Sequence, residues 1–178
     1  DLVMRLSVQS FFQLNTLQAE NLYKIVKEVV PYGLNSLMEV YSGIGGISLL
    51  LKDHAKKIVG IEYIESAVRN ANENAKRNHA EHVEFYAGDA AEVATRFMKK
   101  QVFDVVVVDP PRSGLDDAMV QTLMNSKAKQ IVYVSCNPST LAKNLAILTK
   151  RYRVEKIVPV DMFSQTQHLE SVTLLKRL

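Results

Sequence analysis

Short apolar runs alternate with stretches of helical apolar spacing along nearly the whole chain. Apolar residues that recur every three or four positions indicate amphipathic helices, whereas brief β-branched runs bounded by glycine, proline or asparagine indicate strands. The pattern predicts strands over residues 36–41, 57–61, 83–86, 103–109, 131–134, 154–159 and 171–175. It predicts helices over residues 17–29, 47–52, 64–78, 91–99, 118–124 and 140–150.

Alternating strands and helices with short connections are typical of a doubly wound, mostly parallel sheet with right-handed crossovers. The near-continuous apolar run 103–109 is typical of a parallel strand that helices cover on both faces. The connection between the last two predicted strands is too short for a helical crossover. We therefore expect an α/β, Rossmann-like fold with a seven-stranded, mostly parallel sheet whose last strand is antiparallel.

The chain has 178 residues and 47% hydrophobic content, enough for one core, so we expect a single domain over residues 1–178. Its first helix starts with a capping box, in which Asn15 caps the helix and Gln18 reaches back. Residues 31–33, Pro-Tyr-Gly, end this helix. Because the chain starts at Asp1 and not at Met, we expect a fragment of a longer protein.

Charge and cysteine content narrow the class of protein. The formal net charge of +3 permits a nucleic-acid partner without requiring one. A single cysteine excludes an intrachain disulfide and a cysteine-based zinc or iron–sulfur site within these residues, which fits the reducing cytoplasm. The longest apolar runs have only the length of strands, so we expect no membrane association.

The single cysteine, Cys136, stands between the predicted strand 131–134 and a helix-start signal at Asn137 and Pro138. A cysteine is most often a small buried apolar residue. At the carboxyl end of a strand in an open α/β sheet, however, ligands bind. There a thiol near a helix N-terminus can have its pKa lowered and act as a nucleophile.

A glycine turn, Gly43 and Gly45, follows the first strand, and Glu62 stands about twenty residues on, as in folds that bind a ribose. Ser48 replaces the third glycine of the dinucleotide fingerprint, which disfavours NAD and FAD. S-adenosylmethionine has a ribose and no phosphate, so it fits this pattern. The alternative is that the glycines only form a turn and that Glu62 is a solvated charge.

Two further aspartates end strands of the predicted sheet. Asp89 follows Gly88 and could accept a hydrogen bond from an adenine amino group, and Asp109 could accept one from the cofactor or a substrate base. Aspartate is also common in turns. The prolines between Asp109 and Arg112 fix the backbone, so this corner holds an acid and a base rigidly.

Together these motifs resemble the RNA uracil-5 methyltransferase family, which makes 5-methyluridine in transfer or ribosomal RNA. The matching segments run through nearly the whole chain and are residues 11–15, 40–45, 60–62, 88–89, 108–112, 134–138 and 161–170. The resemblance implies an S-adenosylmethionine site lined by Gln13, Tyr41, Glu62, Asp89 and Asp109. The glycines of the turn, Gly43 and Gly45, belong to the same site.

The resemblance also implies a catalytic pair, with Cys136 as the nucleophile and Glu170 as the base. Carbon 5 of uracil is a weak nucleophile, and a thiolate that adds to carbon 6 activates it. Without the family pattern Glu170 would be an ordinary charged residue beside a strand. His168 assists or orients Glu170 or has a structural role, and Arg112 orients the substrate or fixes the proline corner.

The sequence departs from the family pattern near the glycine turn. Glu39 stands where the family usually has Asp, Ser42 where it has Cys, and Gly46 where it often has an Asn that contacts the cofactor. Family members normally carry an N-terminal RNA-binding domain and a further subdomain, some with an iron–sulfur cluster. These do not fit before Phe11, so we expect this chain to be the C-terminal catalytic part.

The pattern around Cys136 and Asp161 favours a ribosomal RNA substrate, the 23S rRNA, over a transfer RNA. Two other functions stay open. A cytosine-5 RNA methyltransferase uses the same addition chemistry but is expected to carry two cysteines. A cofactor-binding module without catalysis would not require the nucleophile and base positions to be filled.

Overall fold

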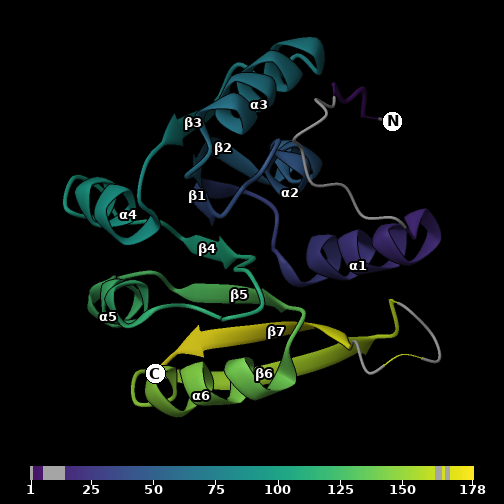
Figure 1. Ribbon diagram of the computed structural model, residues 1–178. Helices are drawn as coiled ribbons and strands as arrows, with labels where there is room; N and C mark the ends of the chain where they lie inside the picture. The colour runs from purple at the N-terminus through teal and green to yellow at the C-terminus, as the bar shows by residue number, and fades with distance from the viewer. Residues whose placement is uncertain (1, 6–14, 163–165, 167–168) are drawn as a thin grey trace.

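The computed structural model describes residues 2–5, 15–162, 166 and 169–178, which form helices on both faces of one sheet (Figure 1). The strands are β1 (Leu34–Val40), β2 (Ala55–Glu62), β3 (Val83–Ala87), β4 (Val105–Val108), β5 (Gln130–Ser135), β6 (Tyr152–Val160) and β7 (Glu170–Arg177). The helices are α1 (Thr16–Val29), α2 (Gly46–Leu50), α3 (Glu65–Arg77), α4 (Ala90–Met98), α5 (Asp117–Asn125) and α6 (Pro138–Leu148), with a 3-10 turn η1 (Lys52–His54).

The seven-stranded sheet has the order β3-β2-β1-β4-β5-β7-β6. Strands β1 to β5 pair in parallel, and β7 is antiparallel to both β5 and β6. The predicted α/β fold with an antiparallel last strand is therefore confirmed. The antiparallel pairing of β7 with β6 follows from a connection that is too short to carry a helix across the sheet.

Every predicted strand and helix is present among the described residues, and the differences lie at their ends. The second helix is shorter than the predicted 47–52, because the chain tightens into η1 at Lys52. Asn15 caps α1 by accepting a hydrogen bond from the Gln18 backbone N–H at 3.2 Å. The predicted return bond from the Gln18 side chain is not observed, since its Oε1 accepts from Asn21 Nδ2 at 3.2 Å.

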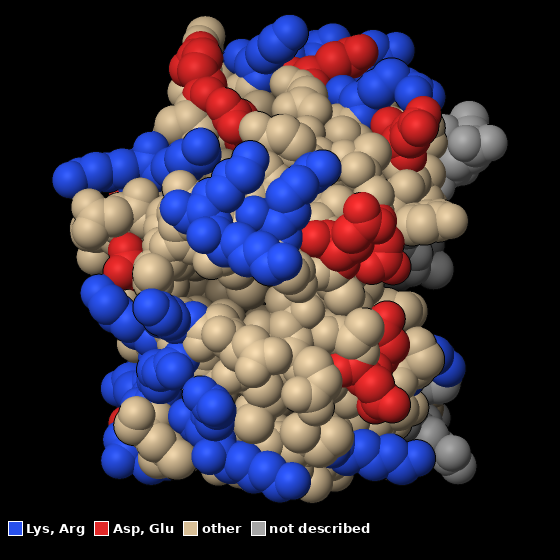
Figure 2. Space-filling view, turned by 90° about the vertical axis from the view of Figure 1, so that its left-hand side faces the viewer, with Lys and Arg blue, Asp and Glu red and all other residues tan. Residues whose placement is uncertain are grey.

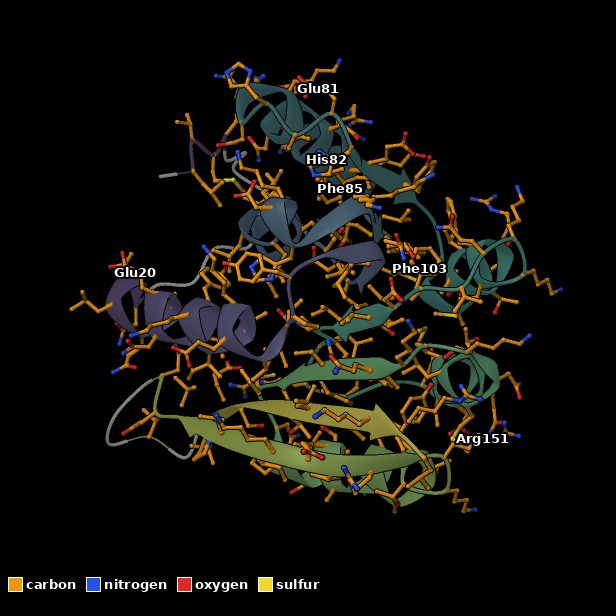
Figure 3. All side chains as sticks on the ribbon, turned by 180° about the vertical axis from the view of Figure 1, so that it is seen from behind. Glu20, Glu81, His82, Phe85, Phe103 and Arg151 are labelled. Atoms are coloured by element: carbon orange, nitrogen blue, oxygen red, sulfur yellow. The ribbon has the colours of Figure 1, made fainter. Side chains whose placement is uncertain are left out.

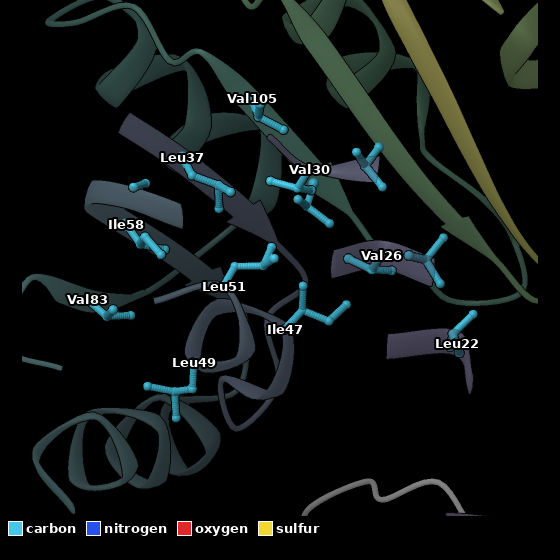
Figure 4. Close-up of a cluster of buried hydrophobic side chains, with 14 of the residues drawn as sticks. Leu22, Val26, Val30, Leu37, Ile47, Leu49, Leu51, Ile58, Val83 and Val105 are labelled. Carbon is cyan, nitrogen blue, oxygen red and sulfur yellow. The ribbon is translucent and has the colours of Figure 1, made fainter. Parts of the chain in front are cut away.

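Side chains alternate along each strand between two hydrophobic clusters, one on each face of the sheet. Helices α1 to α3 cover the first cluster, in which Leu37, Ile58 and Val105 point toward Val26 and Ile47 (Figure 4). Helices α4 to α6 cover the second cluster. Both faces of β4, and of β1 from Ser36 onward, are thus buried, and for β4 this was predicted from its near-continuous apolar sequence.

Among the described residues, no helix combines the length and the apolar character that crossing a membrane requires.

Candidate active site

The candidate residues lie along one edge of the sheet, where the parallel strands have their carboxyl ends. From β3 inward to β5, these ends carry Asp89, Glu62, the glycine turn, Asp109 and Cys136 in this spatial order. Because β7 is antiparallel, its first residue Glu170 reaches the same edge. The fold therefore brings residues that are far apart in sequence onto the edge where open α/β sheets bind ligands.

The glycine turn after β1 depends on backbone conformations that favour glycine. Gly43 has φ 54° and Gly45 has φ 88°, and the Gly45 N–H donates to the Ser42 carbonyl at 2.8 Å. A Cβ on Gly45 would come within 2.5 Å of the Phe85 ring, which Figure 3 labels. Among the described residues, no atom lies within 4 Å of the position of a Cβ on Gly43, so they leave the outer side of the turn open. Tyr41 before the turn also has a positive φ of 67°.

Glu62 holds this turn in place. Its carboxylate accepts hydrogen bonds from the Gly43 N–H at 3.0 Å and from the Ile64 N–H at 2.8 Å. Each carboxylate oxygen has a second lone pair, so half-buried Glu62 retains acceptor capacity for a diol beside the turn. This geometry fits the predicted contact with a ribose.

Asp89 caps α4 by accepting from the Glu92 N–H at 3.0 Å, and its side chain is exposed. It stands at one end of a groove of about 670 Å³ between α4 and α5, which Arg96, Lys99 and Lys100 also line. Figure 2 shows basic side chains gathered beside a hollow on this side of the molecule. An acceptor at the head of a groove fits the predicted contact with an adenine amino group.

Three titratable groups continue one face of the sheet beyond the core. The nearest residues of the first cluster on β4, β5 and β7 are Val107, Val134 and Val172. Two positions further toward the edge stand Asp109, Cys136 and Glu170, so side-chain alternation directs them to the same face, under α1 and α2. Ser135 pairs with Ser171 at the end of the β5–β7 ladder, so Cys136 and Glu170, the residues next beyond this pair, lie near each other, and the charge of Glu170 acts on the thiol.

The electrostatics of this cluster favour protonated acids. Burial, with the charge of Glu170, raises the pKa of Asp109 to about 7. Burial also raises the pKa of Glu170, and Arg112 opposes this effect. Burial raises the pKa of the Cys136 thiol, and the charges of Glu170 and Asp109 raise it further, while Arg112 lowers it. The position at the start of α6 is confirmed, but the expected lowering of the thiol pKa is wrong for the protein alone, because burial and two carboxylates outweigh the helix N-terminus.

The proline corner after β4 is fastened to the start of α6. The Arg112 carbonyl accepts from Asn137 Nδ2 at 3.1 Å and from Thr140 Oγ1 at 3.2 Å. Asn137 also caps α6 through the Ser139 N–H at 3.0 Å. These bonds fix the loop that carries Asp109 relative to the loop that carries Cys136.

Sequence reasoning gave no role to Glu39, which proves to be buried beneath the glycine turn with 2% exposure. Its carboxylate accepts from the Ser48 N–H at 2.8 Å and from the Ser48 hydroxyl. Burial raises the pKa of Glu39 to about 8, although the Ser48 donors lower it, and Asp109 and Glu62 raise it further. A carboxylate within an apolar strand requires donors when buried, and that signal could have identified it.

Tyr41 lies at the boundary between the turn and the proline corner. Burial raises its pKa, and the charges of Asp116, Tyr133 and Asp89 raise it further. Its phenol is therefore neutral and can donate a hydrogen bond to a ligand, as the predicted place in the cofactor site requires. Gln13 and His168, also predicted to belong to the site, lie outside the described residues.

Comparison with known proteins identifies the family. A sequence model of the family described as tRNA (Uracil-5-)-methyltransferase matches residues 1–178. The chain belongs to this family. The uracil-5 methyltransferase family thus accounts for the motifs on this edge, and the predicted resemblance is confirmed.

Individual relatives agree with the family. An uncharacterized RNA methyltransferase of Enterococcus faecalis is 47% identical over 99% of this chain and 39% of its own length. The Pyrococcus abyssi tRNA (uracil-54, C5)-methyltransferase, solved with S-adenosyl-L-homocysteine, is 36% identical with a TM-score of 0.86, over 98% of this chain and 42% of its own. The chain therefore spans well under half the length of these relatives.

More distant structures share the fold alone. The N-methyltransferase NodS of Bradyrhizobium japonicum has a TM-score of 0.75 at 16% identity, over 92% of this chain and 99% of its own. The Rossmann-like methyltransferase architecture is thus common to enzymes with different acceptors.

Proposed function

We propose that this chain is the C-terminal catalytic domain of a longer RNA methyltransferase, in which an N-terminal domain binds RNA. Its reaction transfers a methyl group from S-adenosylmethionine to carbon 5 of a uridine. The observation that carries the proposal is the position of Cys136 near Glu170 at the end of the β5–β7 ladder, on the edge that also holds the glycine turn and Glu62. A reducing compartment, the cytoplasm, suits the free cysteine.

The residues at this edge fit the cofactor. Glu62 accepts from the ribose hydroxyls, Asp89 accepts from the adenine amino group, and Gly43 leaves open space where the chain of the cofactor passes. Tyr41 and Asp109 complete the described part of the site, and Gly45 shapes the turn. Gln13 is assigned to the same site by the family motif alone. When bound, S-adenosylmethionine supplies an electrophilic methyl group on a positively charged sulfur.

The catalytic steps use Cys136 and Glu170. The Cys136 thiolate adds to carbon 6 of uracil, and the electron pair of the 5,6 double bond moves toward the carbonyl at carbon 4. Carbon 5 of this enolate then forms a bond to the methyl carbon while the carbon–sulfur bond of the donor breaks. Glu170 removes the proton from carbon 5, and the thiolate leaves as the double bond forms again.

The raised pKa of Cys136 indicates that cofactor binding precedes activation of the thiol. In the protein alone, burial, Glu170 and Asp109 raise the pKa of the thiol, so the nucleophile stays protonated. A positive charge brought to this edge opposes both carboxylates and favours the thiolate. We infer that Cys136 becomes reactive mainly after the cofactor binds.

The RNA substrate has two candidates. The sequence pattern around Cys136 and Asp161 favours 23S rRNA, which we take as the first candidate. The similarity to the Pyrococcus abyssi tRNA enzyme favours a transfer RNA as the second. The basic residues at the groove between α4 and α5 suit either polyanion.

Methyl transfer followed by nucleoside mass spectrometry tests this function. The chain and the Enterococcus faecalis relative, which has additional sequence, are each incubated with methyl-labelled S-adenosylmethionine and either 23S rRNA or transfer RNA. The proposal predicts labelled 5-methyluridine in one RNA class. Labelled 5-methylcytidine, or binding of S-adenosylhomocysteine without any transfer by either protein, would contradict it.

A further inference from the structure

Tyr23 is a half-buried phenol that the family motifs did not identify, and it reaches the candidate active site from α1. Its ring packs against the first hydrophobic cluster, on the face of the sheet that α1 covers. Glu20, on the same helix, is exposed and points outward (Figure 3). Tyr23 follows buried Ala19 by four residues and precedes buried Val26 by three, so helical spacing turns it toward the sheet.

The Tyr23 hydroxyl lies over the start of α2. A Cβ built on Gly46 would lie 3.5 Å from Tyr23 Oη, an ordinary van der Waals distance. Because Gly46 has no side chain, the Tyr23 hydroxyl faces the space above the end of the glycine turn. A hydroxyl is thus present at the position where the family pattern often has an asparagine amide.

Two carboxyl groups face the same phenol from the sheet. Burial raises the pKa of Tyr23 to about 12, and the charges of Asp109 and Glu39 contribute to this rise. Both carboxyl groups belong to the face under α1, Glu39 from β1 and Asp109 from the end of β4. Glu39 already accepts hydrogen bonds from Ser48. Asp109 directly follows the last residue of β4, at the edge where ligands bind. Tyr23 and Asp109 therefore form one acidic site beside the turn.

The order of the strands indicates which part of the cofactor reaches this acidic site. Strand β1 separates β2, which carries Glu62, from β4, which carries Asp109, so these acids lie roughly 10 Å apart along the edge. With the ribose on Glu62 and the adenine toward Asp89, the methionine part extends toward β4. The ammonium group of this part is a cationic donor, which suits the Asp109 carboxyl group and the neutral Tyr23 oxygen as acceptors.

We propose that the Tyr23 hydroxyl, together with Asp109, binds the ammonium group at the amino-acid end of S-adenosylmethionine. This inference rests on the proposed function, since it assigns a part of the same cofactor. Tyr23 is then a cofactor-binding residue that selects the amino-acid end over the nucleoside alone. Its phenyl ring holds α1 against the core, and its oxygen makes the contact.

Binding of three probes to the wild-type chain and to Tyr23→Phe separates this role from a structural one. The probes are S-adenosylhomocysteine, its decarboxylated analogue, which keeps the amine, and 5′-methylthioadenosine, which lacks the amino-acid end. In Tyr23→Phe, loss of one hydrogen bond to a charged group should lower the affinity for the first two probes by about tenfold and leave the affinity for the third unchanged. Tyr32→Phe is the matched control, because Tyr32 is exposed and stacks on His54.

Each outcome decides the inference. Equal weakening of all three probes would show that Tyr23 only supports the fold, and weakening of S-adenosylhomocysteine alone would assign the contact to the carboxylate. Unchanged binding of all three would exclude a contact. If the wild-type chain binds none of the probes, the cofactor assignment itself fails, which distinguishes failure of the proposed function from failure of this inference.

Discussion

The two halves of the candidate active site are built in different ways. At the ends of β1 to β3, the Glu62 and Asp89 carboxylates accept backbone N–H groups and hold a turn or a helix. At the ends of β4, β5 and β7, Asp109, Cys136 and Glu170 crowd together, and burial is the main cause that raises the pKa of each. The acidic groups of the first half thus have hydrogen-bond donors from the fold itself, whereas the groups of the second half are held in an environment that disfavours their charged forms.

This difference agrees with a division of labour between binding and chemistry. A preformed turn binds a cofactor without reorganisation, because its donors and acceptors are already fixed. Groups with shifted pKa values cluster at sites where protons are transferred or substrates are attacked. Changes at Glu62 or Asp89 should therefore affect cofactor affinity, and changes at Cys136 or Glu170 should affect turnover.

The largest effect is expected from Cys136→Ala. Loss of the nucleophile should lower methyl transfer by about 10⁴-fold, because carbon 5 of uracil then lacks activation. Binding of S-adenosylhomocysteine, measured by calorimetry, should stay within about twofold of wild type, since the thiol lies in the other half. Ser139→Ala, at an exposed position in the first turn of α6, is the control and should retain full activity. Retained methylation in Cys136→Ala would show that this mechanism is wrong.

Glu39→Gln tests the electrostatic coupling beneath both halves. The folded-state pKa of Glu39 is about 8, against 4.5 for the free group, so only the unfolded chain ionises within this window. The free energy of unfolding of the wild-type chain should therefore fall as pH rises from about 5 to 8, by an amount on the order of 3 kcal/mol. In Glu39→Gln this fall should be absent. Urea unfolding at several pH values measures it, with Glu20→Gln as the exposed control. An unchanged pH dependence would contradict the raised pKa.

Glu170→Gln should separate addition of Cys136 and methyl transfer from the later removal of the carbon 5 proton. Without the base, turnover should fall by about a hundredfold, while addition of Cys136 and methyl transfer still proceed. The methylated covalent complex with ordinary RNA should then accumulate and be visible on a denaturing gel. Full turnover without any complex would assign the base to another residue.

Glu62→Gln should show the smallest effect, confined to binding. With a neutral acceptor at the ribose, the affinity for S-adenosylhomocysteine should fall by about tenfold, while the rate at saturating cofactor should not change. Glu65→Gln, on the exposed first turn of α3, is the matched control. A lower saturated rate with unchanged affinity would break the proposed division between the halves.

Much of the binding half could be predicted from the sequence because its signals are local. Gly43, Gly45 and Glu62 have a fixed spacing, and positive φ values explain the glycines directly. The alternation of apolar runs likewise predicted the sheet and its antiparallel last strand. The position of β7 between β5 and β6 was not predicted, because strand order depends on long-range pairing.

The electrostatics of the chemical half could not be predicted from local patterns. The thiol of Cys136 was expected to have a lowered pKa from its place before α6, and its burial near Glu170 and Asp109 reverses that direction. Tyr23 was missed for a similar reason, since in the sequence it is one of the apolar positions of an amphipathic helix. Only the packing of α1 on the sheet brings its hydroxyl to Gly46.

The most direct test of the central claim is a covalent trap. The chain and Cys136→Ala are incubated with S-adenosylmethionine and RNA that carries 5-fluorouridine, where fluorine cannot leave as the carbon 5 proton does. Denaturing electrophoresis and peptide mass spectrometry then search for a protein–RNA adduct, with the Enterococcus faecalis relative in parallel. The account predicts a methylated adduct mapped to Cys136 and missing in Cys136→Ala. An adduct on another residue, or methylation of ordinary RNA by a protein that forms no adduct with the fluorinated RNA, would contradict it.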